Sequence, residues 1–410
     1  MRALGSAAYL TRPLWDKPPK PHVVIPFLGF GSAKGECEKH GFRRSTRRPK
    51  VYDVFIFATE LDLLEIRLNE LDEVVDEFIL IEAPFTFTGL AKPMHYRDNR
   101  DSPALRRFRS RIIAVAVPPP RSPLRTERDW FHYEMEHRLA AGDALRPRMA
   151  LGDVFITSDI DEIPRPEVVR MLRDCAWGAA PPAAAREGWE QGRPTLQDGA
   201  VGPRLQLQLR QYRFSFEFPF GFYPRAAANL YYGQDVLYLG HHHSAATHAL
   251  GDAGWHCTFC FRSLAEYQFK LRAYAHEDRS APRHRTAEAI QRRICAGEDL
   301  GEMLPEAYTF KELARFADWG TPERSMSVVG LPQYVVRHRR RFRFLLPGAG
   351  NCIRELGSES LLSEGGGVDG GGTSSNTETV RFAPWPKLSP PDLEGTRRNA
   401  IQRWVRAANR

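Results

Sequence analysis

The chain alternates between continuous apolar runs and stretches whose apolar residues recur every three or four positions. Residues 51–60, VYDVFIFATE, form a run of mostly β-branched and aromatic side chains, which predicts a buried strand. In residues 61–75 leucines recur at spacings of three and four between Leu61 and Leu71, which predicts an amphipathic helix. Strand and helix patterns then follow one another along the chain.

The same patterns continue to about residue 346. We expect strands at residues 76–84, 111–118, 153–159 and 205–218 and helices at residues 128–145, 166–175 and the second part of 255–279, with a basic helix or strand at residues 334–346. Strands that alternate with helices favour an α/β fold with a largely parallel, Rossmann-like central sheet.

Composition divides the chain into one domain and two tails. Residues 1–48 are rich in proline, glycine and basic residues and predict an extended arm, and residues 49–350 predict a single domain. Within that domain, residues 179–203 are a low-complexity insertion. Residues 351–410 are a Gly/Ser-rich tail with a short helix expected at 397–408. We expect the insertion and both tails to be disordered.

Acidic residues follow the predicted parallel strands at the points where these strands end. Glu60 and Asp62 follow the first strand, Glu82 ends the second, and Asp159 and Asp161 follow the fourth. Open α/β sheets bind their ligands outside the carboxyl ends of the strands. The sequence therefore predicts an acidic rim on a binding crevice.

The segment VFITSDIDEIPRPE, residues 154–167, is the densest part of this rim. Residues two apart in an extended chain point the same way, so Asp159 and Asp161 are expected to face one point and Ile160 the core. The two following prolines delay the next helix. Paired carboxylates suit Mg²⁺ or Mn²⁺, which complete their shell with water and substrate phosphate. Acids at a helix N-terminus explain the same pattern, whereas a glycosidase-like pair fits poorly because both acids lie on one side.

Charge and composition restrict the function classes. The 410 residues include 58 Lys or Arg and 50 Asp or Glu, a formal net charge of +8, which favours anionic partners such as phosphates and nucleotides. Aromatic residues lie in apolar strands rather than among basic residues, so a nucleic-acid partner is not expected. No apolar run approaches the ~18–20 residues of a membrane span, and no signal peptide is evident.

The six cysteines are too few to form a disulfide scaffold for a chain of this length. Cys257 and Cys260 form a single CxxC, and the other four are scattered, so the second pair that a zinc site needs is missing. We expect a buried thiol pair or a local disulfide at this CxxC.

Four segments occur in the order and at the spacings of a known family. They are ELDLLEIRLNEL (60–71), VDEFILIEAPFTFTGLAKP (75–93), GDVFITSDIDEIPRP (152–166) and GWHCTFCFRSLAEYQFKL (254–271). Together they resemble glycosyltransferase family seventeen, the β-1,4-mannosyl-glycoprotein 4-β-N-acetylglucosaminyltransferases that add the bisecting GlcNAc to N-glycans. The resemblance runs from about Val51 to Leu346, and its Cys/His detail is similar to the fungal and microbial branch.

The resemblance implies a GT-A-like domain, UDP-GlcNAc as donor, Mn²⁺ or Mg²⁺ as cofactor and inversion at the anomeric carbon. It implies that Asp161 binds the metal, with Asp159 beside it on the metal, its water or the ribose. The donor-binding residues expected with them are Glu60, Asp62, Glu82, Glu162 and His256. All of these except Glu60 have a structural alternative: Asp62 and Glu162 as helix-capping acids, Glu82 in a surface salt bridge, and His256 as a hydrogen-bonded core residue.

An inverting transfer also needs a carboxylate that accepts the proton of the attacking hydroxyl. Glu266 follows the Trp-His-Cys motif on a predicted helix and is the candidate base, with Glu217 and Asp235 as rivals. The histidines 241–243 and the basic run 337–343 are expected to be solvated.

The predicted function is transfer of GlcNAc from UDP-GlcNAc to a mannose-containing N-glycan acceptor. A non-catalytic carbohydrate-binding protein of the same fold is the alternative. Members of the family usually carry an N-terminal anchor in the Golgi membrane, and none is visible here. We therefore expect either an incomplete N-terminus, with membrane association through a missing anchor, or a different location.

Overall fold

The computed structural model describes residues 23–31, 34–178, 203–233, 246, 248–274, 280–300, 324–348 and 351–357. Several predictions concern residues outside these ranges. They are the disorder of the low-complexity insertion and of most of the tails, the helix at 397–408, Asp235 as a rival base and the solvated histidines 241–243.

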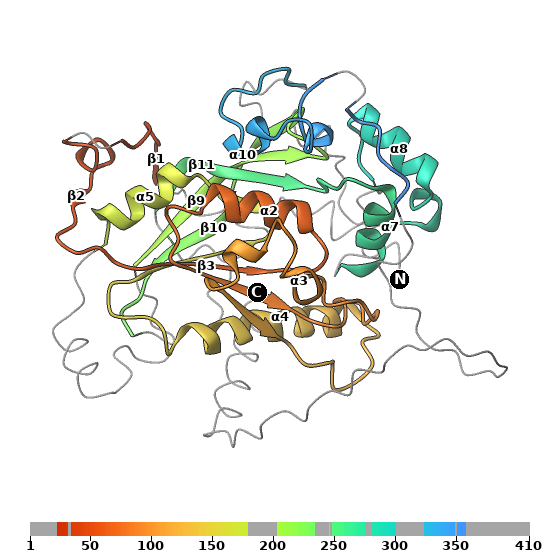
Figure 1. The fold of residues 1–410 in the computed structure, drawn as a ribbon, viewed down its shortest axis with the longest axis horizontal. Coiled ribbons are helices and arrows are strands. Elements are labelled where there is room, and N and C mark those ends of the chain that lie inside the picture. The colour runs from red at the N-terminus through yellow and green to blue at the C-terminus, as the bar shows by residue number, and fades with distance from the viewer. Residues whose placement is uncertain are drawn as a thin grey trace, which may run out of the picture. The chain divides into compact units, whose positions relative to one another are not determined.

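A nine-stranded sheet forms the centre of the described chain (Figure 1), in the order β1-β11-β9-β10-β6-β3-β4-β5, with β7 paired to β11. The strands are β1 (Val23–Ile25), β3 (Val51–Ile56), β4 (Glu77–Glu82), β5 (Ile112–Ala116), β6 (Val154–Asp159), β7 (Glu162–Pro164), β9 (Arg204–Arg213), β10 (Phe218–Leu230) and β11 (His248–Thr258). The neighbours β6, β3, β4 and β5 are parallel, as are β9, β11 and β1, while β10 runs antiparallel between β6 and β9. The predicted α/β fold with a largely parallel sheet is confirmed.

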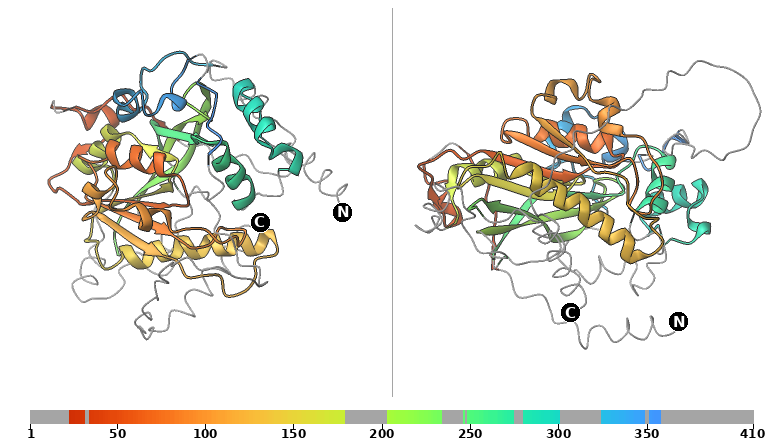
Figure 2. Two further views of the ribbon diagram at one scale, coloured as in Figure 1. Left: turned by 45° about the vertical axis from the view of Figure 1, so that its right-hand side comes forward. Right: turned by 90° about the horizontal axis from the view of Figure 1, so that it is seen from below.

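Helices cover both faces of this sheet, as Figure 2 shows. The α-helices are α2 (Leu61–Glu70), α3 (His95–Asn99), α4 (Glu127–Leu145), α5 (Pro166–Asp174), α7 (Leu264–Ala273), α8 (Ala287–Ala296) and α10 (Gln333–Arg337). Smaller elements are the 3-10 turns η1 (Glu38–His40), η2 (Arg106–Phe108), η4 (Pro282–His284) and η5 (Arg343–Leu345) and the ribbon β2 (Arg43–Arg44) with β8 (Cys175–Ala176). No helix among the described residues is both long and apolar enough to span a membrane.

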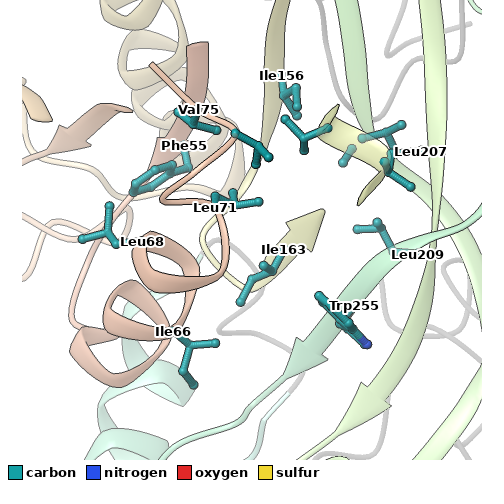
Figure 3. Packing of buried hydrophobic residues seen from close by; sticks show 14 of the residues in the cluster. Phe55, Ile66, Leu68, Leu71, Val75, Ile156, Ile163, Leu207, Leu209 and Trp255 are labelled. Carbon is teal, nitrogen blue, oxygen red and sulfur yellow. The ribbon is translucent and has the colours of Figure 1, made fainter. Parts of the chain in front are cut away.

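Strand β3 is buried on both faces, which explains its continuous apolar sequence. Val51 and Phe55 belong to the core that α2 and α5 cover, whereas Tyr52 and Val54 pack in the core beneath α4. Figure 3 shows Phe55 close to α2 in the larger of these cores. The strand is therefore fixed from both sides, and its carboxyl end is held in place.

The strand predicted at residues 205–218 is in fact two strands. β9 ends at Arg213, and the chain turns at Phe214, whose φ of 62° is left-handed. β10 then returns beside β9 in the antiparallel direction. A phenylalanine rarely adopts this conformation, and no glycine or proline marks the turn, so the alternating pattern reads as one strand.

The start of the domain also differs from the expected arm. Within residues 1–48, β1 pairs with β11 in the main sheet, and Cys37 forms a disulfide with Cys175 at the end of α5. The described part of this segment is thus joined to the sheet. The other expected boundaries stay predictions.

All six cysteines form disulfides. The local disulfide between Cys257 and Cys260 confirms one of the alternatives for the CxxC. The four scattered cysteines, which were given no partner from sequence, form the pairs Cys37–Cys175 and Cys295–Cys352. Their separations of 138 and 57 residues explain why no local spacing revealed them.

Candidate active site

The ends of the parallel strands bring the acidic residues to one edge of the sheet. In the sheet register, Ile56 at the end of β3 lies beside Asp159 at the end of β6 and beside Ile81 near the end of β4. The carboxylates that follow these strands therefore share one rim.

A fully buried arginine fastens the turn that carries Asp159 and Asp161. Arg67 of α2 forms a two-bond ion pair with Asp53 of β3, at 2.6 and 2.7 Å, and both side chains are inaccessible to solvent. Its Nη1 donates to the carbonyl oxygens of Asp159 at 2.9 Å and Glu162 at 2.8 Å. One guanidinium thus fixes the main chain on both sides of Asp161.

The two carboxylates of this turn have different partners. Asp159 Oδ1 lies 3.0 Å from Nη2 of Arg138 on α4, and Asp161 Oδ2 lies 3.5 Å from Nε2 of His256 on β11. Ile160 between them is buried in the core, as predicted.

His256 is held at both ring nitrogens. Nδ1 lies 2.9 Å from the amide nitrogen of Gln211, and Nε2 lies 3.1 Å from the hydroxyl of Thr258. When Nδ1 accepts from the Gln211 amide, the neutral ring carries its proton on Nε2, which faces Asp161. His256 can therefore orient Asp161 by hydrogen bonding.

Glu162 lies inside the turn. Its side chain is buried in β7, and Oε2 accepts from the backbone N–H of Asp159 at 3.0 Å. The N-cap position of α5 is Arg165, without a side-chain hydrogen bond, so Glu162 is not the cap of that helix. Glu162 therefore stabilises the turn through this hydrogen bond. Its role as a donor-binding residue stays a prediction.

Glu60 forms an ion pair with Lys270, which lies 210 residues later in the sequence. Its Oε1 accepts from Nζ of Lys270 on α7 at 3.0 Å, and its Oε2 accepts from the N–H groups of Ala58 and Thr59 at 3.1 and 2.8 Å. Burial alone would raise the pKa of Glu60, but the charge of Lys270 and the Thr59 N–H outweigh it and lower this pKa to about 2. Glu60 is therefore ionised throughout the neutral pH range.

Glu82 and Asp62 also have protein partners. Glu82 is buried and accepts from the N–H groups of Tyr96 and Arg97 at the start of α3, and burial raises its pKa. Asp62 accepts two hydrogen bonds of 2.8 Å from Arg262. Glu82 is thus not part of a surface salt bridge, and Asp62 is not the N-cap of α2, which is Glu60. The contact of Glu82 and Asp62 with a donor stays a prediction.

Glu266 closes a capping box at the start of α7. Its Oε2 accepts from the N–H and hydroxyl of Ser263 at 2.9 and 2.8 Å, while Ser263 Oγ accepts from the N–H of Glu266. Burial raises the pKa of Glu266. Within the described chain Oε1 has no hydrogen-bond partner. The rival Glu217 is buried and paired with Arg324.

The sequence of this chain matches a known protein family. The sequence profile described as glycosyltransferase family 17 matches residues 2–181 and 195–355. This chain belongs to glycosyltransferase family 17. It is similar to the β-1,4-mannosyl-glycoprotein 4-β-N-acetylglucosaminyltransferases of Homo sapiens, Rattus norvegicus and Mus musculus, each 26% identical over 238 residues. The match spans 52% of this chain and 40% of each relative.

A divalent cation fits this family 17 site if the substrate supplies part of its shell. No three His, Cys, Asp or Glu side chains in the described ranges lie close enough to hold a metal by themselves. Asp161 offers a carboxylate at the rim, with Asp159 two residues before it, and Mg²⁺ or Mn²⁺ commonly bind one or two carboxylates together with phosphate and water. Asp161 would be the principal ligand, and Asp159, whose Oδ1 contacts Arg138, would be the second.

The basic partners of these acids were not predicted from the sequence. Arg67, Arg138 and Lys270 all lie in segments that were predicted as helices, but none was singled out. Lys270 follows Glu266 by one helical turn, and Arg67 is an arginine in an otherwise leucine-rich helix. A basic residue on the apolar face of a helix near predicted carboxylates is the signal that would have identified Arg67.

Proposed function

We propose that this chain transfers GlcNAc from UDP-GlcNAc to a mannose-containing N-glycan, with inversion at the anomeric carbon. The names of the curated relatives give transfer of GlcNAc to a mannosyl-glycoprotein, and family membership supports that part of the proposal. The observation that carries it is the Asp159–Glu162 turn, which Arg67 holds rigidly at the carboxyl ends of the strands, where α/β sheets bind nucleotides.

The reaction is a single displacement. The acceptor hydroxyl oxygen bonds to the anomeric carbon while the bond from that carbon to the diphosphate oxygen breaks, and UDP leaves with the electron pair. Mg²⁺ or Mn²⁺ held by Asp161 would neutralise charge on the diphosphate. His256 on β11 orients Asp161 through the contact between its Nε2 and Oδ2 of Asp161. Arg67 holds Asp161 in position because it binds the main chain of the turn on both sides of this residue.

Glu266 is the residue that we propose as the base. Its Oε1 is free of other hydrogen bonds among the described residues, whereas Oε2 holds the capping box. Burial raises its pKa, which brings a carboxylate closer to the range in which it accepts a proton effectively. The proton of the acceptor hydroxyl would move to this oxygen as the new bond forms.

We also propose that the enzyme works in the oxidising lumen of the secretory pathway, in the Golgi. Three disulfides support this location because structural disulfides are rare in reducing compartments.

Incubation with UDP-GlcNAc, Mn²⁺ and a biantennary N-glycan tests the proposal. We expect UDP release together with a glycan whose mass has increased by one N-acetylhexosamine. Linkage analysis of the product then defines the attached position. If no mannose-containing acceptor supports turnover of UDP-GlcNAc and the protein only binds the glycan, the result would instead favour a carbohydrate-binding protein.

A further inference from the structure

The acidic rim contains a cation that the proposed reaction has not used. Lys270 donates to Oε1 of Glu60 at 3.0 Å. The side chain of Glu60 is only 3% exposed, whereas that of Lys270 is 32% exposed. The side chain of Lys270 therefore combines a contact with a buried carboxylate and partial exposure to solvent.

Both members of this pair are fixed in position. The second oxygen of Glu60 is bound to the N–H groups of Ala58 and Thr59, directly after β3. Lys270 extends from α7, whose first turn is locked by the capping box of Ser263 and Glu266. A cation that is held before the substrate arrives needs no reorganisation when negative charge develops nearby.

The carboxylates of the turn lie near enough to affect Lys270. Burial alone would lower the pKa of Lys270, but the charge of Glu60 and then that of Asp161 raise it, and Asp159 contributes in the same direction. Lys270 thus carries a full positive charge at neutral pH and faces the region where these carboxylates gather.

Two other cations near the rim, Arg138 and Lys92, are bound to protein groups and less exposed than Lys270. Arg138 is bound to Glu134 and Asp159. Lys92 is buried and donates to the carbonyl oxygens of Ala58 and Pro93. The side chain of Lys270 is more exposed, at 32%, than those of these two residues.

We propose that Lys270 donates a hydrogen bond to the diphosphate of the nucleotide-sugar donor, an assignment that rests on the proposed function. Three carboxylates, Glu60, Asp159 and Asp161, would otherwise repel that anion. During transfer the electron pair of the breaking bond stays on the diphosphate oxygen, and the ammonium between this group and Glu60 stabilises the added charge. Lys270 keeps its proton, and the proton of the acceptor goes to the base.

The alternative is that the Glu60–Lys270 pair only fastens α7 to the end of β3. Affinities for UDP and uridine separate these roles, because the two ligands share the base and ribose and differ in the diphosphate. If the pair only fastens α7, loss of Lys270 should change the affinity for both ligands or the melting temperature. If Lys270 contacts the phosphate, its loss should change the affinity for UDP alone.

Calorimetry with the full chain and Mn²⁺ tests the proposal. We expect Lys270→Met to weaken UDP binding about 10- to 100-fold, the loss of one hydrogen bond to a charged group, and to leave uridine binding unchanged. Arg272→Met is the matched control, because Arg272 lies on the same helix, is exposed, and contacts the main chain of Gln268; it should bind both ligands like the parent. Lys270→Arg retains a cation beside Glu60 and should show a smaller loss, again for UDP only.

Two results would overturn the inference. One is UDP affinity in Lys270→Met equal to that of the parent. The other is an equal loss of UDP and uridine binding in Lys270→Met and Lys270→Arg. If the parent transfers GlcNAc in either case, only the role of Lys270 is wrong. A parent that binds UDP no better than uridine contradicts the role of Lys270 and the proposed function together.

Discussion

At the scale of single residues, the rim carboxylates differ in how many of their oxygens the protein already uses. Glu60 and Glu82 have both oxygens bound to protein groups. Glu266 uses Oε2 for the capping box and leaves Oε1 without a partner in the described chain. An oxygen that is free can accept a proton from substrate, so Glu266 can combine a structural role with a catalytic one.

Glu266→Gln separates these two roles. A glutamine at this helix position still accepts from Ser263 and completes a capping box, but it cannot act as a base. We expect kcat to fall about 100- to 10,000-fold with an unchanged melting temperature. Ser263→Ala is the control, because it removes the cap and should lower stability by ~1 kcal/mol while keeping the base. Activity retained in Glu266→Gln would exclude Glu266 as the base.

The positions of the acids at strand ends could be predicted from sequence, but their partners could not. Parallel strands align their carboxyl ends, so the strand pattern predicts that Glu60 and Asp159 lie at the same edge of the sheet. Lys270 lies 210 residues from Glu60 and Arg67 lies 92 residues from Asp159. Contacts over such separations depend on the tertiary packing of helices, which no local spacing encodes.

At the scale of elements, α2 connects the rim to the rest of the domain. Arg67 binds the Asp159–Glu162 turn, Asp62 binds Arg262 beside the CxxC disulfide, and Glu70 at the end of α2 accepts from the N–H of Tyr334 in α10. Burial raises the pKa of Glu70 from 4.5 to about 7. The contact between α2 and α10 therefore contains a carboxyl group that titrates near neutral pH.

This shift predicts a pH dependence of stability. Between pH 4.5 and 7 the folded protein keeps a proton on Glu70 that the unfolded chain has released, so the free energy of unfolding falls as the pH rises through this range. Glu70→Gln stays uncharged and should lose this dependence. We expect the stability of the variant relative to the parent to be higher at pH 8 than at pH 5, by up to ~3 kcal/mol.

Urea unfolding of both proteins at the two pH values measures this difference. Glu73→Gln is the matched control, because the side chain of Glu73 is 87% exposed and should give the same pH profile as the parent. Parallel profiles for the parent and Glu70→Gln would contradict the shifted pKa.

The strands that are buried on both faces were the easiest elements to predict. β3, β4 and β6 have continuous apolar runs because helices cover both faces of the sheet. β10 was not predicted as a separate strand, because the turn before it lies at Phe214 rather than at a glycine. The basic segment at 334–346 was left open between helix and strand, and it forms the short helix α10 and the turn η5.

At the scale of the whole molecule, disulfides join segments that are distant in the sequence. Cys37–Cys175 joins the segment before β2 to the end of α5, and Cys295–Cys352 joins the end of α8 to residues 351–357. Removing the first pair as Cys37→Ser/Cys175→Ser should lower the free energy of unfolding by about 2–5 kcal/mol, since it opens a loop of 138 residues. Urea unfolding measures the loss, and peptide mapping without reductant that recovers free thiols at these positions would contradict the pairing.

The central claim is that Asp161 at the rim supports the departure of UDP. The initial rate of UDP release from UDP-GlcNAc, with Mn²⁺ and a mannose-containing N-glycan, tests it most directly in the parent, in Asp161→Asn and in Asp101→Asn. Asp101 is a surface control with a 63% exposed side chain. We predict a loss of at least about 100-fold in Asp161→Asn, with the melting temperature kept and Asp101→Asn equal to the parent. UDP release by Asp161→Asn at the rate of the parent would contradict the account.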